Sequence, residues 1–295
     1  MITPILLACL VETVYAQPLE PTLPELKSIK IEKLLSRPIT QNLSRTPHLN
    51  DLLTLNFLGN FGSGEKGYWP NGVIQARNGN FYGTTQLGGK YDLGTVFKMS
   101  PDGNLKTVID FNTTGAKPFS TLLQTADGSF YGITGQGGSS AKGTVFQVTP
   151  NGRLKILANF NGINGAEPRS ALILAKDGNF YGTTTKGSQF DRGTIYRMAS
   201  NGQIATLVSF KGTNGASPYA ALLQAKDGNF YGTTKEGGKN HPNCFAGCGT
   251  IFKMEPNGKL TTLKYFNGLN GGNPDAPLIQ ASNGALYGTS TIGGK

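Results

Sequence analysis

Short apolar runs separated by glycine-rich turns recur along the chain from residue 52 onward. Representative runs are residues 221–225 (Ala-Leu-Leu-Gln-Ala), 229–234 (Asn-Phe-Tyr-Gly-Thr-Thr) and 249–254 (Gly-Thr-Ile-Phe-Lys-Met). Their β-branched and aromatic residues favour strands over helices. Asn-Gly and Asp-Gly pairs stand between many of the runs, and such pairs supply the positive φ that a two-residue hairpin turn requires. The pattern therefore predicts short antiparallel strands joined by tight turns.

The strands recur as a unit of about 50 residues. The phrase Asn-Phe-Tyr-Gly-Thr-Thr, or a variant of it, begins at residues 80, 129, 179, 229 and 285. A second phrase, Gly-Thr-aliphatic-aromatic, begins at residues 94, 143, 193 and 249. Four strands in a repeat of this length are typical of a β-propeller blade, which buries both faces of its sheet only against neighbouring blades. We therefore expect an all-β propeller of about five four-stranded blades, the last of them incomplete.

Successive strands of a blade alternate in direction, so both tight turns of each blade are expected on one face of the propeller. Asp127, Asp177 and Asp227 stand directly before the glycines of these turns, and we interpret them as turn residues rather than catalytic acids. The longer connections are expected on the opposite face, where binding residues are commonly found. These connections are the crossovers between blades and the glycine-rich loops at residues 88–93, 137–142, 187–192 and 237–248.

The repeat resembles the tandem repeat called GloVer, which occurs in bacterial surface proteins described as choice-of-anchor proteins. The resemblance rests on residues 227–234 (Asp-Gly-Asn-Phe-Tyr-Gly-Thr-Thr), 237–238 (Gly-Gly) and 249–253 (Gly-Thr-Ile-Phe-Lys), and it covers residues 52–295. It implies a surface or secreted protein and supplies no catalytic residues. A looser similarity to kelch-like propellers does not extend to the tryptophan of the kelch repeat, since Trp69 is the only tryptophan.

The N-terminal region is expected to divide into two segments before the repeats. Residues 1–16 read as a secretory signal peptide, with an apolar run and small residues before a cleavage point after Ala16. Lipoprotein anchoring through Cys9 is the alternative. Residues 17–50 are polar and rich in proline, which predicts a linker, and residues 51–295 form the repeat domain. No apolar stretch is long enough for a transmembrane helix, so none is expected. The signal peptide predicts a secreted or cell-envelope protein.

The net charge of +10 is carried mainly by the repeats. A basic surface attracts polyanions. Acidic polysaccharide, lipid headgroups and nucleic acid are such polyanions, and export makes nucleic acid an unexpected partner. We expect an anionic polysaccharide or a surface protein as the partner. The alternative is that the charge serves solubility alone.

Cys244 and Cys248 lie in the longest loop, and in an exported protein such a pair predicts a local disulfide. The alternative is a zinc site that adds His241, for which a fourth ligand is lacking. We therefore expect no metal, and the sequence contains no cofactor-binding motif.

One repeat position varies while its surroundings stay constant. It follows the proline of each crossover and is occupied in turn by Asn71, Phe119, Arg169, Tyr219 and Asp275. Together with Trp69, these residues could hydrogen-bond to and stack on a sugar-like ligand beside the central funnel. The alternative is an exposed position under no constraint. The tyrosines of the repeated phrase are uniform instead, which indicates packing between blades.

These observations favour a non-catalytic binding propeller whose ligand is an anionic glycan or a surface protein. Two alternatives remain. One is a polysaccharide hydrolase or lyase in which carboxylates converge across blades, although no catalytic residue is identified. The other is a purely structural surface repeat, and the sequence does not set the oligomeric state.

Overall fold

The computed structural model describes residues 61, 64–239, 242 and 244–293, and every regular element in these ranges is a β-strand. The first sheet contains β1 (Tyr68–Pro70), β2 (Ile74–Gln75), β3 (Phe81–Leu87), β4 (Thr95–Met99) and β5 (Leu105–Asp110). The second contains β6 (Ala116–Pro118), β7 (Leu123–Gln124), β8 (Phe130–Gln136), β9 (Thr144–Val148) and β10 (Leu154–Asn159). The third contains β11 (Ile173–Leu174), β12 (Phe180–Thr184), β13 (Thr194–Met198) and β14 (Ile204–Ser209). The fourth contains β15 (Leu223–Gln224), β16 (Phe230–Thr234), β17 (Thr250–Met254) and β18 (Leu260–Tyr265), and a final hairpin is formed by β19 (Ile279–Gln280) and β20 (Leu286–Tyr287).

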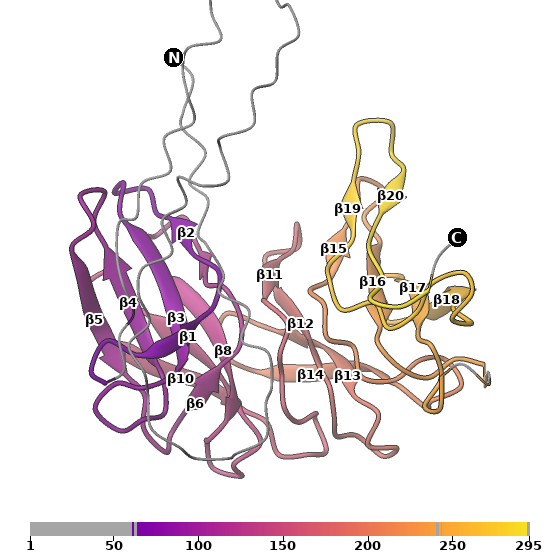
Figure 1. The fold of residues 1–295 in the computed structure, drawn as a ribbon, viewed down its shortest axis with the longest axis horizontal. Helices are drawn as coiled ribbons and strands as arrows, with labels where there is room; N and C mark the ends of the chain where they lie inside the picture. The colour runs from indigo at the N-terminus through magenta and orange to yellow at the C-terminus, as the bar shows by residue number, and fades with distance from the viewer. Residues whose placement is uncertain (1–60, 62–63, 240–241, 243, 294–295) are drawn as a thin grey trace, which may run out of the picture. The chain divides into compact units, whose positions relative to one another are not determined.

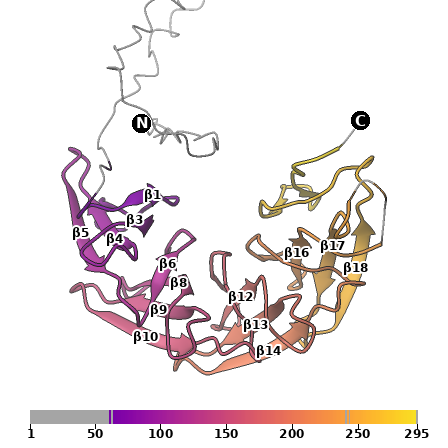
Figure 2. The same ribbon diagram turned by 60° about the horizontal axis from the view of Figure 1, so that its bottom comes forward.

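Each sheet is an antiparallel meander, as the order β11-β12-β13-β14 illustrates (Figure 1). In that sheet Phe180 pairs with Met198 and Thr184 pairs with Thr194, so the two repeated phrases lie side by side in register. Within residues 61–293 the sheets follow one another along an arc, with β5, β10, β14 and β18 on its outer side (Figure 2). The predicted all-β propeller, with four full blades and an incomplete fifth, is therefore confirmed.

The first strand of each blade is broken in two, whereas the sequence predicted one continuous strand. In the second sheet, for example, β6 and β7 both pair with β8. The break follows from Lys117 and Pro118, because Lys117 has a φ of 53° and proline lacks the N–H that a continuous ladder needs. Glu167 and Ser217 repeat this backbone conformation in the next two blades, each with a φ of 51°.

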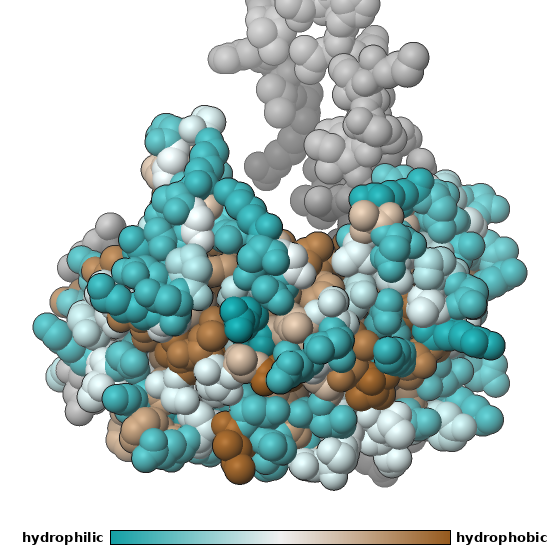
Figure 3. Space-filling view, turned by 180° about the vertical axis from the view of Figure 1, so that it is seen from behind, coloured by the Kyte–Doolittle hydropathy of each residue, from teal (hydrophilic) through white to brown (hydrophobic). Residues whose placement is uncertain are grey.

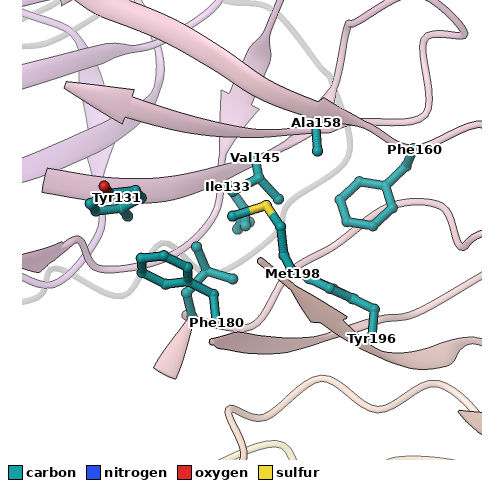
Figure 4. Packing of buried hydrophobic residues seen from close by; sticks show 9 residues of the cluster. Tyr131, Ile133, Val145, Ala158, Phe160, Phe180, Tyr196 and Met198 are labelled. Atoms are coloured by element: carbon teal, nitrogen blue, oxygen red, sulfur yellow. The ribbon is translucent and has the colours of Figure 1, made fainter. Parts of the chain in front are cut away.

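The hydrophobic core lies between neighbouring sheets. Between the second and third sheets, Tyr131 of β8 stacks on Phe180 of β12 at 4.5 Å between ring centroids (Figure 4). Tyr181 and Phe230 repeat this stacking at the next junction, at 4.3 Å. Tyr82, Tyr131 and Tyr181 thus pack between blades, as predicted, whereas Tyr287 of the last repeat is 55% exposed. Seen from behind in Figure 3, hydrophilic residues cover most of the visible face and hydrophobic ones gather in patches between them.

Each third-strand aromatic residue fills the space above a glycine of the second strand. Phe146 of β9 lies over Gly132 of β8, where an added Cβ would come within 2.4 Å of the ring. The same ring meets Phe111 of the preceding blade edge to face, at 5.0 Å between centroids. Glycine in this phrase is therefore required by the close approach of an aromatic ring.

The tight-turn aspartates have the role that the sequence predicted. Asp227 accepts hydrogen bonds from the Asn229 backbone N–H, the Asn229 side chain and the Tyr231 hydroxyl. The hydrogen bond from the Asn229 side chain is the largest of the effects that lower the pKa of Asp227. Such a carboxylate is occupied by its own turn.

Cys244 and Cys248 form the predicted disulfide, with their Cα atoms 5.2 Å apart. Both sulfur atoms are thereby removed as zinc ligands. The predicted signal peptide, Cys9 and the linker lie outside the described residues, as does His241. Within the described ranges no helix is long and apolar enough to span a membrane.

The buried phenol of Tyr181 predicts a loss of stability at alkaline pH. Burial, followed by the hydrogen bond to Asp177, raises the pKa of Tyr181 to about 12. The phenol titrates near pH 10 in an unfolded chain. Because the folded pKa is the higher one, this contribution is fully present below about pH 10 and is lost as the pH rises toward 12.

We therefore expect the free energy of unfolding to fall as the pH rises from about 10 to 12. Tyr181→Phe should make this fall smaller. Urea denaturation at several pH values would measure it. Tyr91→Phe, which changes a half-exposed loop residue, is the control. An unchanged slope in Tyr181→Phe would contradict the assignment.

Candidate ligand-binding site

The varied residues that follow the crossover prolines lie in the break of the first strand, as Phe119 does between β6 and β7. In the second blade, for example, the break lies between β6 and β7, the two short segments that pair with β8. A residue in the break is not part of the regular strand pairing. The structure links four side chains from this position with one lysine into an uninterrupted line. We call this line the inner row: Phe119, Arg169, Tyr219, Lys235 and Asp275.

Arg169 joins the second and fourth blades through its two aromatic neighbours. Its guanidinium carbon lies 4.4 Å from the centroid of Phe119 and 5.4 Å from that of Tyr219. Guanidinium groups are attracted to ring faces at these distances. Its Nε atom is buried and has no hydrogen-bond partner among the described residues. The arginine is thus held by rings and retains donor capacity.

Lys235 extends the row to the last hairpin. Its Nζ lies 4.8 Å from the ring centroid of Tyr219 and 3.9 Å from Oδ2 of Asp275. The lysine comes from the end of β16, and Asp275 comes from the following crossover. The fourth blade and the final hairpin therefore contribute to this half of the row.

The ring of Phe119 is accommodated by a local glycine. An added Cβ at Gly135 would come within 2.3 Å of the Phe119 ring. Gly135 and Lys235 occupy the same position of the repeat, two blades apart. The row is therefore lined by a small residue in the second blade and by a long one in the fourth. This alternation of size sets the contour of the inner side.

The charges of the inner row are loosely paired. Arg169 Nη2 lies 3.8 Å from Oε2 of Glu167, and Lys235 Nζ lies 3.9 Å from Oδ2 of Asp275. Both separations exceed the 2.7–3.2 Å of a direct hydrogen bond, roughly the range found for N–H donors. By contrast, Lys186 donates to Glu167 at 2.9 Å, and this carboxylate raises the pKa of Lys186.

Two of the predicted site residues are not part of the row. Asn71 donates to Thr84 Oγ1 at 2.8 Å and to the Pro118 carbonyl at 2.9 Å, which ties the first blade to the second. Trp69 is 55% exposed, and its aromatic contact is with Tyr68. It stands at the repeat position of Lys117 and Glu167, which precedes the proline.

Sequence reasoning missed Lys235 as a member of the site. The available signal was a second varied position, directly after the phrase Phe-Tyr-Gly-Thr-Thr. Its occupants in blade order are Gln86, Gly135, Thr185, Lys235 and Thr291. The first and second strands of a blade lie side by side. A varied residue at the end of the second strand is therefore close to the varied residue of the first strand.

Four carboxylates of the loop connections make structural contacts. Asp92 accepts hydrogen bonds from the Tyr68 hydroxyl and the Gly88 N–H, and Asp191 accepts one from the Gly187 N–H. Glu167 and Asp275 each face a cation. Within the described part of the chain, no three His, Cys, Asp or Glu side chains gather as metal ligands would. The arrangement supports recognition by stacking and charge more directly than acid–base chemistry.

Comparison with known proteins gives a family match and several structural likenesses. A family model described as the Gloeobacter/Verrucomicrobia repeat matches residues 49–176 and 152–295. No curated protein matches the chain. A gluconolactonase from Xanthomonas campestris is similar in structure, with 12% identity, a TM-score of 0.50, and coverage of 75% of this chain and 69% of that one.

Two further solved structures resemble the chain. One is a luciferin-regenerating enzyme, with 12% identity, a TM-score of 0.49, and coverage of 75% of this chain and 70% of that one. The other is a periplasmic gluconolactonase from Pseudomonas aeruginosa, with 19% identity, a TM-score of 0.47, and coverage of 73% and 64%. At such identities the likeness concerns the fold alone.

Proposed function

The chain belongs to the Gloeobacter/Verrucomicrobia repeat family, and from this premise we propose that it is an exported, non-catalytic propeller that binds an acidic polysaccharide along its inner row. The observation that carries the proposal is the alternation of ring, cation, ring, cation and carboxylate across successive blades. The disulfide between Cys244 and Cys248 supports an oxidising compartment.

The chemistry of a sugar chain suits this alternation. The C–H face of a pyranose ring stacks on aromatic side chains, and Phe119 and Tyr219 are two such rings, two blades apart. A uronate carboxylate is a bidentate acceptor that matches the guanidinium of Arg169. Because Arg169 and Lys235 lie 3.8 and 3.9 Å from their own carboxylates, a ligand can compete for them without breaking a direct hydrogen bond.

Titration with oligogalacturonate and with an uncharged oligosaccharide of equal length, at low and high salt, tests this function. We expect the acidic sugar to bind, and Tyr219→Ala to weaken binding by about tenfold or more, because a stacked ring contributes roughly 1.5–3 kcal/mol when buried. Tyr91→Ala, which removes a half-exposed tyrosine that is not part of the inner row, is the matched control and should leave the affinity unchanged.

Salt separates the inner row from diffuse charge. Binding that disappears entirely at high salt and is indifferent to Tyr219→Ala would reject the site and point to the net charge of +10 alone. Release of shortened sugars during the titration would instead favour the hydrolase alternative.

A further inference from the structure

The long connections between strands gather on one face of the repeat domain, along the lower edge in Figure 1. Because the strands of a blade alternate in direction, its glycine-rich loop and its crossover leave the sheet at the same end. Backbone hydrogen bonds also join them across blades, since the N–H of Glu167 donates to the Lys142 carbonyl and that of Ser217 to the Arg192 carbonyl, both at 2.9 Å. We define the loop face as residues 88–93, 137–142, 187–192 and 237–248 together with the crossovers 111–118, 160–168 and 210–218.

The loop face carries large apolar side chains at the tips of its turns. They are 41% to 108% exposed and comprise Tyr91, Ile163, Phe190 and Phe245. The tight turns at the other end of the complete blades contain none of the exposed large hydrophobic residues of the described part of the chain. These turns are residues 76–80, 100–104, 125–129, 149–153, 175–179, 199–203, 225–229 and 255–259. Scattered apolar residues are ordinary on a protein surface, but here the apolar turn tips belong to the long connections.

The turns of the loop face hold their apolar tips in fixed, outward positions. The backbone N–H of Ile163 donates to Oδ1 of Asn161 at 2.9 Å. Phe245 is carried by the short loop that the disulfide between Cys244 and Cys248 closes. A residue that is already held in place loses little conformational entropy when a partner covers it, so these tips are preorganised for binding.

The loop face is positively charged, whereas the charges of the tight turns balance. The loop face contains six Lys and Arg side chains and three carboxylates, and the tight turns of the complete blades contain five of each kind. Two lysines lie beside apolar tips, with Nζ of Lys90 5.3 Å from the ring centroid of Tyr91 and Nζ of Lys211 5.8 Å from that of Phe190. None of the six cations forms an ion pair with another described residue; they are Lys90, Lys117, Lys142, Arg192, Lys211 and Lys239.

We propose that the loop face binds the surface of a lipid bilayer that contains anionic headgroups. The apolar tips enter the boundary between headgroups and acyl chains, where aromatic side chains are favoured, and the neighbouring lysines stay at the level of the lipid phosphates. Such binding combines burial of apolar area with attraction between basic side chains and anionic lipids. Because the tips come from four separate connections with cations among them, they suit an extended anionic surface. The inner row contributes no residue to this face.

Co-sedimentation of the full chain with lipid vesicles tests the apolar contribution. We expect binding to vesicles of phosphatidylglycerol and phosphatidylcholine in equal parts. The double variant Phe190→Ser with Phe245→Ser should bind about tenfold more weakly or worse, because two rings no longer enter the apolar region. Leu174→Ser, which removes an exposed apolar side chain of β11 outside the loop face, is the matched control and should bind as the wild type does.

A pair of charge variants tests whether the position of the cations matters. Lys90→Gln with Lys211→Gln should weaken binding to the same vesicles by about tenfold or more, because both lysines lie near the lipid phosphates. Lys176→Gln with Lys226→Gln lowers the net charge equally but acts in two tight turns, and this control should bind nearly as the wild type does. Vesicles of phosphatidylcholine alone should bind the wild type more weakly than the anionic vesicles do.

The proposal is overturned if the full chain does not bind anionic vesicles, or if the loop-face variants and their controls lose affinity equally. It is also overturned if Tyr219→Ala abolishes vesicle binding while the loop-face variants retain it, because the lipid would then occupy the inner row. The double variant Phe190→Ser with Phe245→Ser should bind oligogalacturonate as the wild type does. The failure of lipid binding is therefore distinguishable from the failure of polysaccharide binding.

Discussion

Phe160→Ala should lower the free energy of unfolding by about 3–5 kcal/mol, the range typical of removing a buried phenylalanine ring. Phe160 is 0% exposed and meets the ring of Tyr196, 5.1 Å away between centroids, at the junction of the second and third blades (Figure 4). The loss should be near the upper end of this range, because Tyr196 is itself fully buried and the surrounding strands cannot collapse into the space.

Denaturation by urea, followed by circular dichroism, measures this effect. Phe245→Ala is the matched control, since the same substitution is made at a side chain that is 108% exposed at the tip of the disulfide loop. The control should change stability by less than about 0.5 kcal/mol. Equal losses in the two variants would show that the junction between these blades does not carry the stability of the domain.

Gly132→Ala should cost about 1–3 kcal/mol, because overpacking forces neighbouring side chains or backbone to move. The added methyl group would lie 2.4 Å from Cζ of Phe146 and 2.9 Å from its Cε1. Relief requires the Phe146 ring to shift against Phe111, which it contacts from the other side. The ring therefore has little room to move.

The same substitution at Gly288 is the control within the repeat. There the methyl group meets the end of the Leu278 side chain, which can turn away, and no aromatic atom of the described residues lies within 4 Å of it. We expect Gly288→Ala to change stability by less than about 0.5 kcal/mol. A comparable loss at both glycines would mean that backbone freedom, rather than the aromatic ring, explains the glycine of this phrase.

The sequence by itself determined the fold class and the turns of this protein. A period of about 50 residues, with Asp-Gly or Asn-Gly pairs at fixed places, specifies local hairpins whose geometry depends on few neighbours. The disulfide between Cys244 and Cys248 was likewise predictable, because four residues of separation bring the two sulfur atoms within reach.

The composition of the inner row was decided only by the tertiary structure. The sequence placed Phe119, Arg169, Tyr219 and Asp275 at one repeat position, but it could not show that Lys235 links Tyr219 to Asp275. It also grouped Trp69 with them, which the structure does not. Side chains from different blades meet through the packing of whole sheets, and the distances depend on how each blade is placed against the next. The geometry of a hairpin depends on a few consecutive residues and can be predicted from them. Contacts between blades depend on how whole sheets pack, which the sequence pattern does not show.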